Sequence, residues 1–377
     1  MASTFSFGFS GDDIDIDDTE INNVDESIVH GVGAASTTPE LVKAEKFDMN
    51  DWLSTLPSQI SYNTLNISAS QGAECGTESR ALTVARRDVF DIRTQLMVED
   101  SAEEQNGELI AGLEKGDITP NFYEGGFKTW ECSIDLAGLV AAEGVNFEDR
   151  HIIELGSGTA VPSVALFAQL LSQTQTESTS AAAAKKRTHF TFADYNSAVL
   201  RLVTLPNLLL TWNHFITHHN TNPSSDPQPN PESRPAEQEE ELDITPELLG
   251  RFQSDLANRG IKIDFISGAW SPSFVELVFS SPELAGFKTL ILASETIYSP
   301  GSLVAFSETL LALLRQPSRE SRALIAAKKV YFGVGGGVDE FLVVLRGKCE
   351  GNLRVEERMD FKSRGVGRLI LEIGLGK

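Results

Sequence analysis

Two glycines that follow an apolar run at residues 151–155 could bring a ligand close to the backbone. The chain reads Glu154-Leu155-Gly156-Ser157-Gly158 here, and the apolar segment 161–171 that follows predicts a helix. Glycine permits a tight turn and close approach, and a helix N-terminus attracts anionic or polar ligand groups. A lone G-x-G is weak evidence, because several nucleotide cofactors use such turns.

The surrounding residues narrow the choice of cofactor. The dinucleotide pattern G-x-G-x-x-G requires glycine where Val161 stands, whereas Glu154, Gly156 and Gly158 satisfy the E/D-x-G-x-G pattern of methyltransferases. The sequence therefore predicts S-adenosylmethionine, and not a nicotinamide cofactor, as the ligand of this turn.

A carboxylate after the next apolar run is a candidate partner for the ribose hydroxyls. Asp194 ends the segment 188–193 and is followed by Tyr195 and Asn196. Its distance from Gly156 falls to the expected ~20 residues once an insertion at 172–187 is left out. Asp194 could also cap the following helix, and the two roles can coexist.

Two later segments also follow predicted strands. Gly268 in the sequence Ser267-Gly268-Ala269-Trp270 would allow close approach, and the Trp270 ring could face adenine or belong to the core. Ser294 and Glu295 come after the fourth predicted strand, where methyltransferases with this glycine pattern usually bind the methyl acceptor. The Asn/Asp-Pro-Pro-Tyr/Phe motif of adenine and glutamine methylation does not occur there.

The elements that position these residues alternate between strand and helix. Predicted strands are 151–155, 188–193, 261–266, 289–293 and 323–327. Predicted helices are 161–171, 198–212, 274–279, 303–314 and 338–345. Alternation predicts a parallel sheet with helices on both faces. The segments 354–359 and 367–373 predict a closing antiparallel hairpin, so we expect the α/β, Rossmann-like fold of the seven-stranded methyltransferases.

Composition divides the chain further. We expect residues 1–75 to be an acidic, largely disordered extension and residues 76–377 to be the methyltransferase domain, with insertions at 172–187 and 220–242. The net charge of −23 disfavours direct DNA binding and favours a basic partner, although acidity also serves solubility.

Three scattered cysteines, Cys75, Cys132 and Cys349, indicate neither a disulfide framework nor a metal site. They favour a reducing intracellular compartment, and we expect cytoplasm and nucleus. No apolar run approaches the ~18 residues of a membrane span, so no membrane association is expected.

Several segments together resemble one family, the eukaryotic, fungal-type protein-histidine N-methyltransferases that act on a large-subunit ribosomal protein. The matching segments are YEGGFKTWECSIDL (123–136), ELGSGTAVP (154–162), DYNSAVLRLVTLPN (194–207), SGAW (267–270), SETIY (294–298), KKVYFGVGGGV (328–338) and the opening FSFGFSGDD (5–13).

The resemblance implies a cofactor site made of the turn, the three later strand ends and a lid at 121–133. The implied residues are Thr129, Trp130, Glu131, Cys132, Ser133, Gly156, Asp194, Tyr195, Asn196, Gly268, Ala269, Trp270 and Ser294. Family members often carry an acidic residue where this chain has Ala269, so only backbone contacts are expected there.

The resemblance also implies methylation of the ring nitrogen of histidine that is distal to the backbone. A free imidazole is mostly neutral at pH 7, whereas deprotonating an amine costs roughly 4 to 5 kcal/mol, so little general-base power is needed. We expect catalysis to depend on alignment, with Glu295 orienting the ring through its other N–H. Glu295 could instead be a strand-end carboxylate that supports Tyr298 or the lid.

Other interpretations remain open at this stage. The segment 333–337 is either a substrate-binding loop or a helix lead-in. Glu295-Thr296-Ile297-Tyr298 is similar to the D-x-x-Y motif of lysine methyltransferases of the same fold. A noncatalytic role is a further alternative, in which the acidic chain binds a ribosomal protein as an assembly chaperone.

Overall fold

The structure is a computed structural model that describes residues 42–68, 82–100, 125–175, 187–219, 240–318, 320–362 and 365–376. The chain divides into two units, Met1–Glu40 and Leu41–Lys377. The first unit, with the FSFGFSGDD segment and its acidic cluster, lies outside the described residues, so everything below concerns the second.

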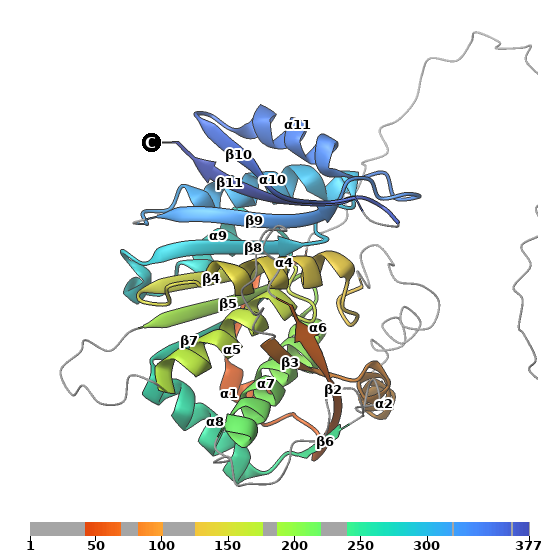
Figure 1. The fold of residues 1–377 in the computed structure, drawn as a ribbon, viewed down its shortest axis with the longest axis vertical. Helices are drawn as coiled ribbons and strands as arrows, with labels where there is room; N and C mark the ends of the chain where they lie inside the picture. Colours follow the sequence, from red (N-terminus) through yellow and green to blue (C-terminus); the bar gives the residue numbers. More distant parts are fainter. Residues whose placement is uncertain are drawn as a thin grey trace, which may run out of the picture. The chain divides into compact units, whose positions relative to one another are not determined.

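The second unit is built on an eight-stranded sheet of order β1-β7-β5-β4-β8-β9-β11-β10 (Figure 1). Its strands are β1 (Glu45–Phe47), β4 (Arg150–Leu155), β5 (Thr188–Asp194), β7 (Ile261–Ser267), β8 (Lys288–Ser294), β9 (Ser321–Lys328), β10 (Leu353–Phe361) and β11 (Arg368–Leu375). The five central strands are parallel, and β11 lies antiparallel between β9 and β10. The predicted Rossmann-like methyltransferase fold with a closing antiparallel hairpin is confirmed.

The central strands are apolar in nearly every residue because both faces of the sheet are covered. In β8, Leu290 and Leu292 belong to one hydrophobic core, and the intervening Ile291 and Ala293 belong to the other. Successive side chains of a strand point to opposite faces, so a continuous apolar run fills two cores at once.

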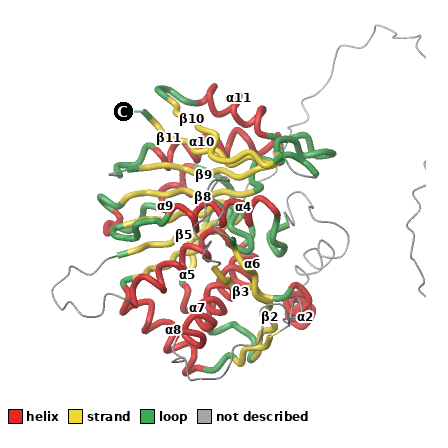
Figure 2. Tube along the Cα trace, in the orientation of Figure 1, coloured by secondary structure: helices red, strands yellow, loops and turns green. Residues whose placement is uncertain are grey.

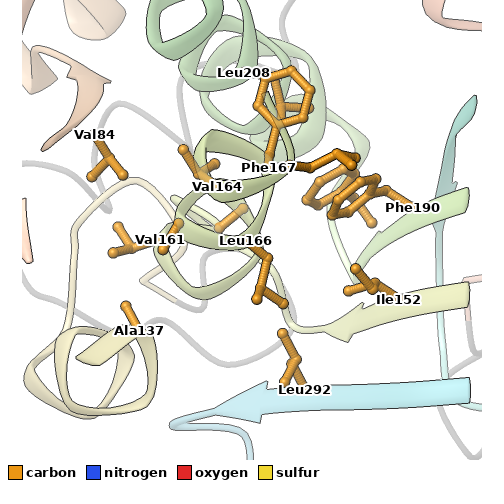
Figure 3. Packing of buried hydrophobic residues seen from close by; sticks show 14 of the residues in the cluster. Val84, Ala137, Ile152, Val161, Val164, Leu166, Phe167, Phe190, Leu208 and Leu292 are labelled. Carbon is orange, nitrogen blue, oxygen red and sulfur yellow. The ribbon is translucent and has the colours of Figure 1, made fainter. Parts of the chain in front are cut away.

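Helices form a layer on each face. One core receives α4 (Glu131–Glu143), α5 (Val161–Gln175), α7 (Leu205–His219) and α8 (Pro246–Arg259). The other receives α9 (Pro272–Val278), α10 (Pro300–Leu314) and α11 (Val338–Lys348). Figure 3 shows how α5 fills the first core: Leu166 lies over Ile152 and Leu292, while Val161 faces Val84 and Ala137. None of the described helices is long and apolar enough to cross a bilayer.

The N-terminal region corrects the expected domain boundary. Residues 42–68 contain β1, α1 (Met49–Leu53) and β2 (Gln59–Ile67), so the prediction of a largely disordered extension to residue 75 is wrong for this stretch. The stretch is ordered because Trp52, Ile60 and Ile67 are buried, although acidic and polar neighbours dilute them in the sequence. Strand β1 extends the large sheet by pairing antiparallel with β7.

Strand β2 is the centre of a second, three-stranded sheet. Its neighbours are β3 (Leu82–Arg87) and β6 (Glu240–Asp243), both antiparallel to it. This sheet lies beside α7 and next to α2 (Val89–Asp100) in the lower part of Figure 2.

The two predicted insertions fall mostly outside the described residues, at 176–186 and 220–239. Their edges are ordered: α5 continues to Gln175, and residues 240–242 belong to β6.

Candidate active site

The turn after β4 needs its glycines. Gly156 and Gly158 have φ values of 64° and 50°, in the left-handed region that glycine tolerates best. A Cβ at Gly156 would lie 2.7 Å from the Cγ2 atom of Thr296. The Ser157 N–H donates to the carbonyl of Ala193 at 2.8 Å, which fixes the turn to the end of β5.

Glu154 lies fully buried beneath this turn. Its Oε2 atom accepts a hydrogen bond from the Ser163 N–H at 3.0 Å, at the start of α5. Burial raises the pKa of the carboxyl from 4.5 to about 8, so the group is mostly neutral at pH 7. Its Oε1 atom has no hydrogen-bond partner among the described residues.

Asp194 ties the end of β5 to the glycine turn. Its Oδ2 atom accepts from the Gly158 N–H at 3.0 Å, and its Oδ1 atom from the Asn196 N–H at 3.2 Å. Asn196 is the residue that caps the following helix α6 (Ser197–Val199), through the Ala198 N–H. The Gly268 N–H meets the carbonyls of Asp194 and the half-buried Tyr195 at 3.1 and 3.2 Å.

A π-helix lies where one continuous helix was expected. The five residues Leu200–Thr204 separate α6 from α7. The Thr204 hydroxyl donates to the Gly158 carbonyl at 2.7 Å, and the Asn207 side chain donates to the Thr159 carbonyl at 2.9 Å. Single π-turns within helices frequently occur at functional sites, and this one supports the turn from below.

The expected lid contacts the turn from the other side. A Cβ at Gly158 would lie 3.1 Å from the Gly126 carbonyl oxygen, and the Thr129 and Thr159 hydroxyls are 3.1 Å apart. The Trp130 indole N–H donates to the Gly125 carbonyl at 2.9 Å. Residues 121–124 of the predicted lid lie outside the described residues.

The residues in the first turn of α4 differ in their exposure. Cys132 and Ser133 are buried, whereas the carboxylate of Glu131 is mostly exposed and lies 3.4 Å from Arg368 of β11. The structure therefore keeps Cys132 with the other candidate residues and gives the Glu131 side chain an ion pair with the closing hairpin.

The segment after β7 is covered by residues that the sequence did not single out. The Ala269 N–H donates to the Val42 carbonyl at 2.9 Å, and a Cβ at Gly268 would lie 2.6 Å from the Lys43 carbonyl oxygen. Trp270 is half-buried, with its ring edge-to-face against Phe274 and Phe306. Trp270 thus contributes to the core, and its contact with adenine stays a prediction.

A buried charge cluster holds this covering segment in place. The Lys46 ammonium of β1 lies 2.7 Å from Asp264 Oδ2, and His189 Nε2 is 2.7 Å from the same atom. Burial would raise the pKa of Asp264, but hydrogen bonds with His189 and Lys46 outweigh it and lower that pKa to about 2.

Glu295 is the most unusual carboxylate of the site. It directly follows Ser294, the last residue of β8, and its φ of 56° is strained for a residue with a side chain. The side chain is only 7% exposed, and its closest cation is the Lys328 ammonium at 3.8 Å. Among the described residues no backbone N–H donates to this carboxylate, and its neighbouring side-chain donors are the Cys132 thiol and the Tyr331 hydroxyl.

Three side chains, those of Lys328, Cys132 and Tyr331, lie beside Glu295. Lys328 ends β9 and its ammonium lies 5.2 Å from the centre of the Trp130 ring. Burial, followed by the charge of Glu295, raises the pKa of the Cys132 thiol and of the Tyr331 hydroxyl, so both groups stay neutral. The Tyr331 oxygen accepts the Lys328 N–H at 3.2 Å.

Lys328 and Tyr331 are site residues that the sequence reasoning missed as individual groups. Both belong to a segment used only as a family signal, KKVYFGVGGGV. They also directly follow the fifth predicted strand, 323–327, at the edge where α/β sheets bind ligands. Applying that rule to the fifth strand would have found them.

The site has unmet polar groups that suit S-adenosylmethionine, with its amino, carboxylate and hydroxyl groups. Buried oxygens without partners among the described residues include Glu154 Oε1, Ser157 Oγ and Thr296 Oγ1. Buried polar groups are nearly always satisfied, so these oxygens indicate a polar ligand at the turn. The described residues contain no cluster of His, Cys, Asp or Glu side chains that could hold a metal.

Comparison with known proteins finds relatives that share one name. The chain is 34% identical over 304 residues to Histidine protein methyltransferase 1 of Saccharomyces cerevisiae, covering 78% of this chain and 76% of that protein. It is 32% identical over 344 residues to Histidine protein methyltransferase 1 of Schizosaccharomyces pombe, covering 90% and 84%.

Two other comparisons add less. No protein-family model matches the chain. An S-adenosylmethionine-dependent methyltransferase structure from Clostridium acetobutylicum aligns over 66% of this chain and 93% of that one. Its identity is 8% and its TM-score of 0.32 is too low to bear on function.

Proposed function

The chain belongs to the family of histidine protein methyltransferases, and on that premise we propose that it methylates a histidine of a basic large-subunit ribosomal protein. The methyl donor is S-adenosylmethionine, and the acceptor is the ring nitrogen distal to the backbone. The enzyme works in the cytoplasm and nucleus, through which a ribosomal protein passes.

The observation that carries this proposal is the Glu295 carboxylate. It is buried, it is held in a strained backbone conformation, and the cation that it faces, the Lys328 ammonium, is 3.8 Å away. A buried carboxylate with so few partners is costly, and the N–H of a neutral imidazole would give it a further hydrogen-bond donor.

Bound S-adenosylmethionine supplies a methyl group on a positively charged sulfur. Glu295 accepts a hydrogen bond from one ring N–H, which leaves the lone pair of the other nitrogen as the nucleophile. The same carboxylate stabilises the positive charge that the ring gains, while the Lys328 ammonium at 3.8 Å partly balances the carboxylate before substrate binds. Neither Cys132 nor Tyr331 competes as a base, because their raised pKa values keep both groups protonated.

Cofactor binding falls to the residues around the glycine turn. Gly156 and Gly158 bring the backbone close, and Asp194 hydrogen-bonds to that backbone at the place where the ribose is expected. The lid residues Thr129 and Trp130 close the opposite side, since Thr129 contacts the turn itself. These contacts support a role in cofactor binding for the turn and the lid. Neither needs to transfer a proton.

A basic ribosomal substrate is supported by charge. A chain with a net charge of −23 attracts a basic protein and steers its approach. An imidazole acceptor also asks less of the site than an amine, because a neutral imidazole needs no deprotonation before it attacks.

The test begins with large ribosomal subunits from cells that lack this protein. Incubation with the full chain and S-adenosylmethionine should add one methyl group to a histidine, located by peptide mass spectrometry. Methylation of a lysine would replace the proposal by the related amine chemistry, and tight binding without any transfer would favour an assembly chaperone.

Glu295→Gln tests the role of the carboxylate. Turnover should fall by at least about 10²-fold, because the ring is no longer held in line, while cofactor affinity measured by calorimetry stays unchanged. The control is Glu308→Gln on α10, where the carboxylate is half-exposed and pairs with Lys348. Near-normal turnover of Glu295→Gln with intact cofactor binding would contradict the assignment.

A further inference from the structure

The connection between β9 and α11 is a closed loop, residues 329–337, which we call the glycine loop. Val330 and Gly337 form an antiparallel bridge, and the Tyr331 N–H donates to the Gly336 carbonyl at 3.0 Å. The Val338 N–H donates to the Lys329 carbonyl at 3.2 Å and closes the loop at its base. Its backbone is therefore organised by its own hydrogen bonds.

Glycines fit this loop tightly against the residues that follow Glu295. A Cβ at Gly336 would lie 2.2 Å from the Tyr298 carbonyl oxygen, and a Cβ at Gly337 would lie 2.5 Å from the Lys329 carbonyl oxygen. Any larger residue would push the loop away from the β8–α10 connection. The position of the loop relative to the site is thus fixed by backbone contact.

The loop presents one aromatic ring inward and one outward. Tyr331 is buried beside Glu295, whose charge acts on its hydroxyl. The next residue, Phe332, is 78% exposed, and Val330 and Val334 are exposed on either side of it. Single exposed apolar residues are ordinary, but three within five residues of a fixed loop form a contact surface.

Carboxylates continue this surface. Asp339 and Glu340, in the first turn of α11, are both exposed immediately after the loop. The apolar tip is thereby followed by two negative charges. Such a surface fits a partner that carries an apolar patch beside basic side chains.

We propose that Phe332, with Val330 and Val334, docks the substrate protein, and that Asp339 and Glu340 contact its basic side chains. This inference rests on the proposed function, since it names the surface that binds the same substrate. Consecutive Cα atoms are about 3.8 Å apart, so the exposed Phe332 lies one residue from Tyr331, which is beside Glu295. A second copy of the chain is disfavoured because it carries the same net charge of −23.

Phe332→Ser is the direct test, with large ribosomal subunits from cells lacking the protein as the substrate. Phe332 would be buried by the bound substrate, so its loss should raise KM roughly 10- to 30-fold with kcat nearly unchanged. A short synthetic peptide that spans the methylated histidine should show no change, because it lacks the surrounding surface. Cofactor affinity by calorimetry should equal that of the unsubstituted chain.

The matched control is Phe90→Ser, which removes another phenylalanine that is 73% exposed, on α2. It should leave KM for the ribosomal subunit unchanged. A second variant, Asp339→Asn combined with Glu340→Gln, should raise the same KM and leave peptide turnover intact.

Three results would overturn the docking role. The first is an unchanged KM of Phe332→Ser on the ribosomal subunit. The second is an equal loss on subunit and peptide, which would place Phe332 in the catalytic site itself. The third is a change from dimer to monomer in light scattering, which would make this surface a self-association contact. If the unsubstituted chain methylates no histidine, the proposed function fails instead.

Discussion

Glu154 shows how burial changes the chemistry of a single residue in the turn. Its carboxyl is enclosed beneath the glycines, and hydrogen bonding from Ser163 offsets only part of the loss of water. A proton therefore stays on the group at pH 7, with a pKa of about 8. The neutral carboxyl can donate a hydrogen bond as well as accept one.

This raised pKa predicts a pH-dependent stability. The unfolded chain releases the proton near pH 4.5 and the folded chain near pH 8, so the folded form holds the extra proton between these values. The free energy of unfolding should fall as pH rises through this window, by up to about 1.4 kcal/mol per pH unit from this group. Urea unfolding of the cofactor-free protein measures the slope.

Glu154→Gln keeps the shape and removes the titration. This variant should lose that slope and should be more stable than the unsubstituted chain near pH 8. Glu308→Gln, at an exposed position, should keep the slope. Parallel pH curves for Glu154→Gln and the unsubstituted chain would show that Glu154 is already ionised in the folded protein.

Gly156 offers a second test at the same scale. Gly156→Ala introduces a Cβ at a φ of 64° and only 2.7 Å from Thr296 Cγ2, so we expect about 1–3 kcal/mol of destabilisation and weaker cofactor binding. Adding Thr296→Ser removes the contacting methyl group and should recover part of the loss. Thermal unfolding and cofactor calorimetry measure both effects.

The matched control for Gly156→Ala is Gly250→Ala. A Cβ at Gly250, within α8, has nothing within 4 Å. This change should leave stability equal or raise it by up to about 1 kcal/mol, because alanine favours a helix. Equal effects at the two positions would argue against steric strain in the turn.

Sequence reasoning reached some of these residues and not others for identifiable reasons. The glycine turn and Asp194 follow apolar runs in a pattern that chain order alone reveals. Glu295 and its surroundings come from two strand ends, those of β8 and β9, and from the start of α4, as Lys328, Tyr331 and Trp130 illustrate. Such a meeting of distant residues is set by the fold and leaves no local pattern.

At the scale of elements, β1 is the clearest addition to the expected fold. Its three residues, Glu45–Phe47, are largely exposed, so no apolar run marks them as a strand. They are held by pairing with β7 and by the Lys46 contact with Asp264. The five central strands were predictable because each is an apolar run covered on both faces, and the π-helix was not because it continues an ordinary helical pattern.

Lys46→Met should loosen this edge of the sheet. Asp264 would keep its hydrogen bond to His189 but lose the link to β1, so the segment over Gly268 and Ala269 should open more often. Amide exchange of Ala269, whose N–H is bonded to Val42, should accelerate roughly 5- to 10-fold.

Lys262→Met is the control for Lys46→Met. Lys262 lies on β7, and its exposed ammonium donates to the Ser281 hydroxyl at 3.4 Å. Its removal should leave exchange at Ala269 unchanged. Equal protection of that amide in Lys46→Met would show that backbone pairing alone holds β1.

At the scale of the whole molecule, net charge should govern how the substrate arrives. With −23 on the enzyme and an excess of positive charge on the substrate, attraction weakens as salt shortens the screening length. Raising salt from about 50 to about 300 mM should increase KM for the RNA-free basic ribosomal protein several-fold and leave kcat nearly constant. A KM that does not change with salt would show that charge does not contribute to substrate binding.

The pairing of β1 with β7 also sets an order of events during synthesis. Glu45 lies opposite Ser267, so the first strand of the sheet leaves the ribosome long before the strand that receives it. At about 5–20 residues per second, the delay is on the order of 10 to 45 s. During that interval the β4–β5 core can assemble, but the edge over Gly268 stays unfinished. The candidate cofactor site is therefore completed only after most of the chain has been made.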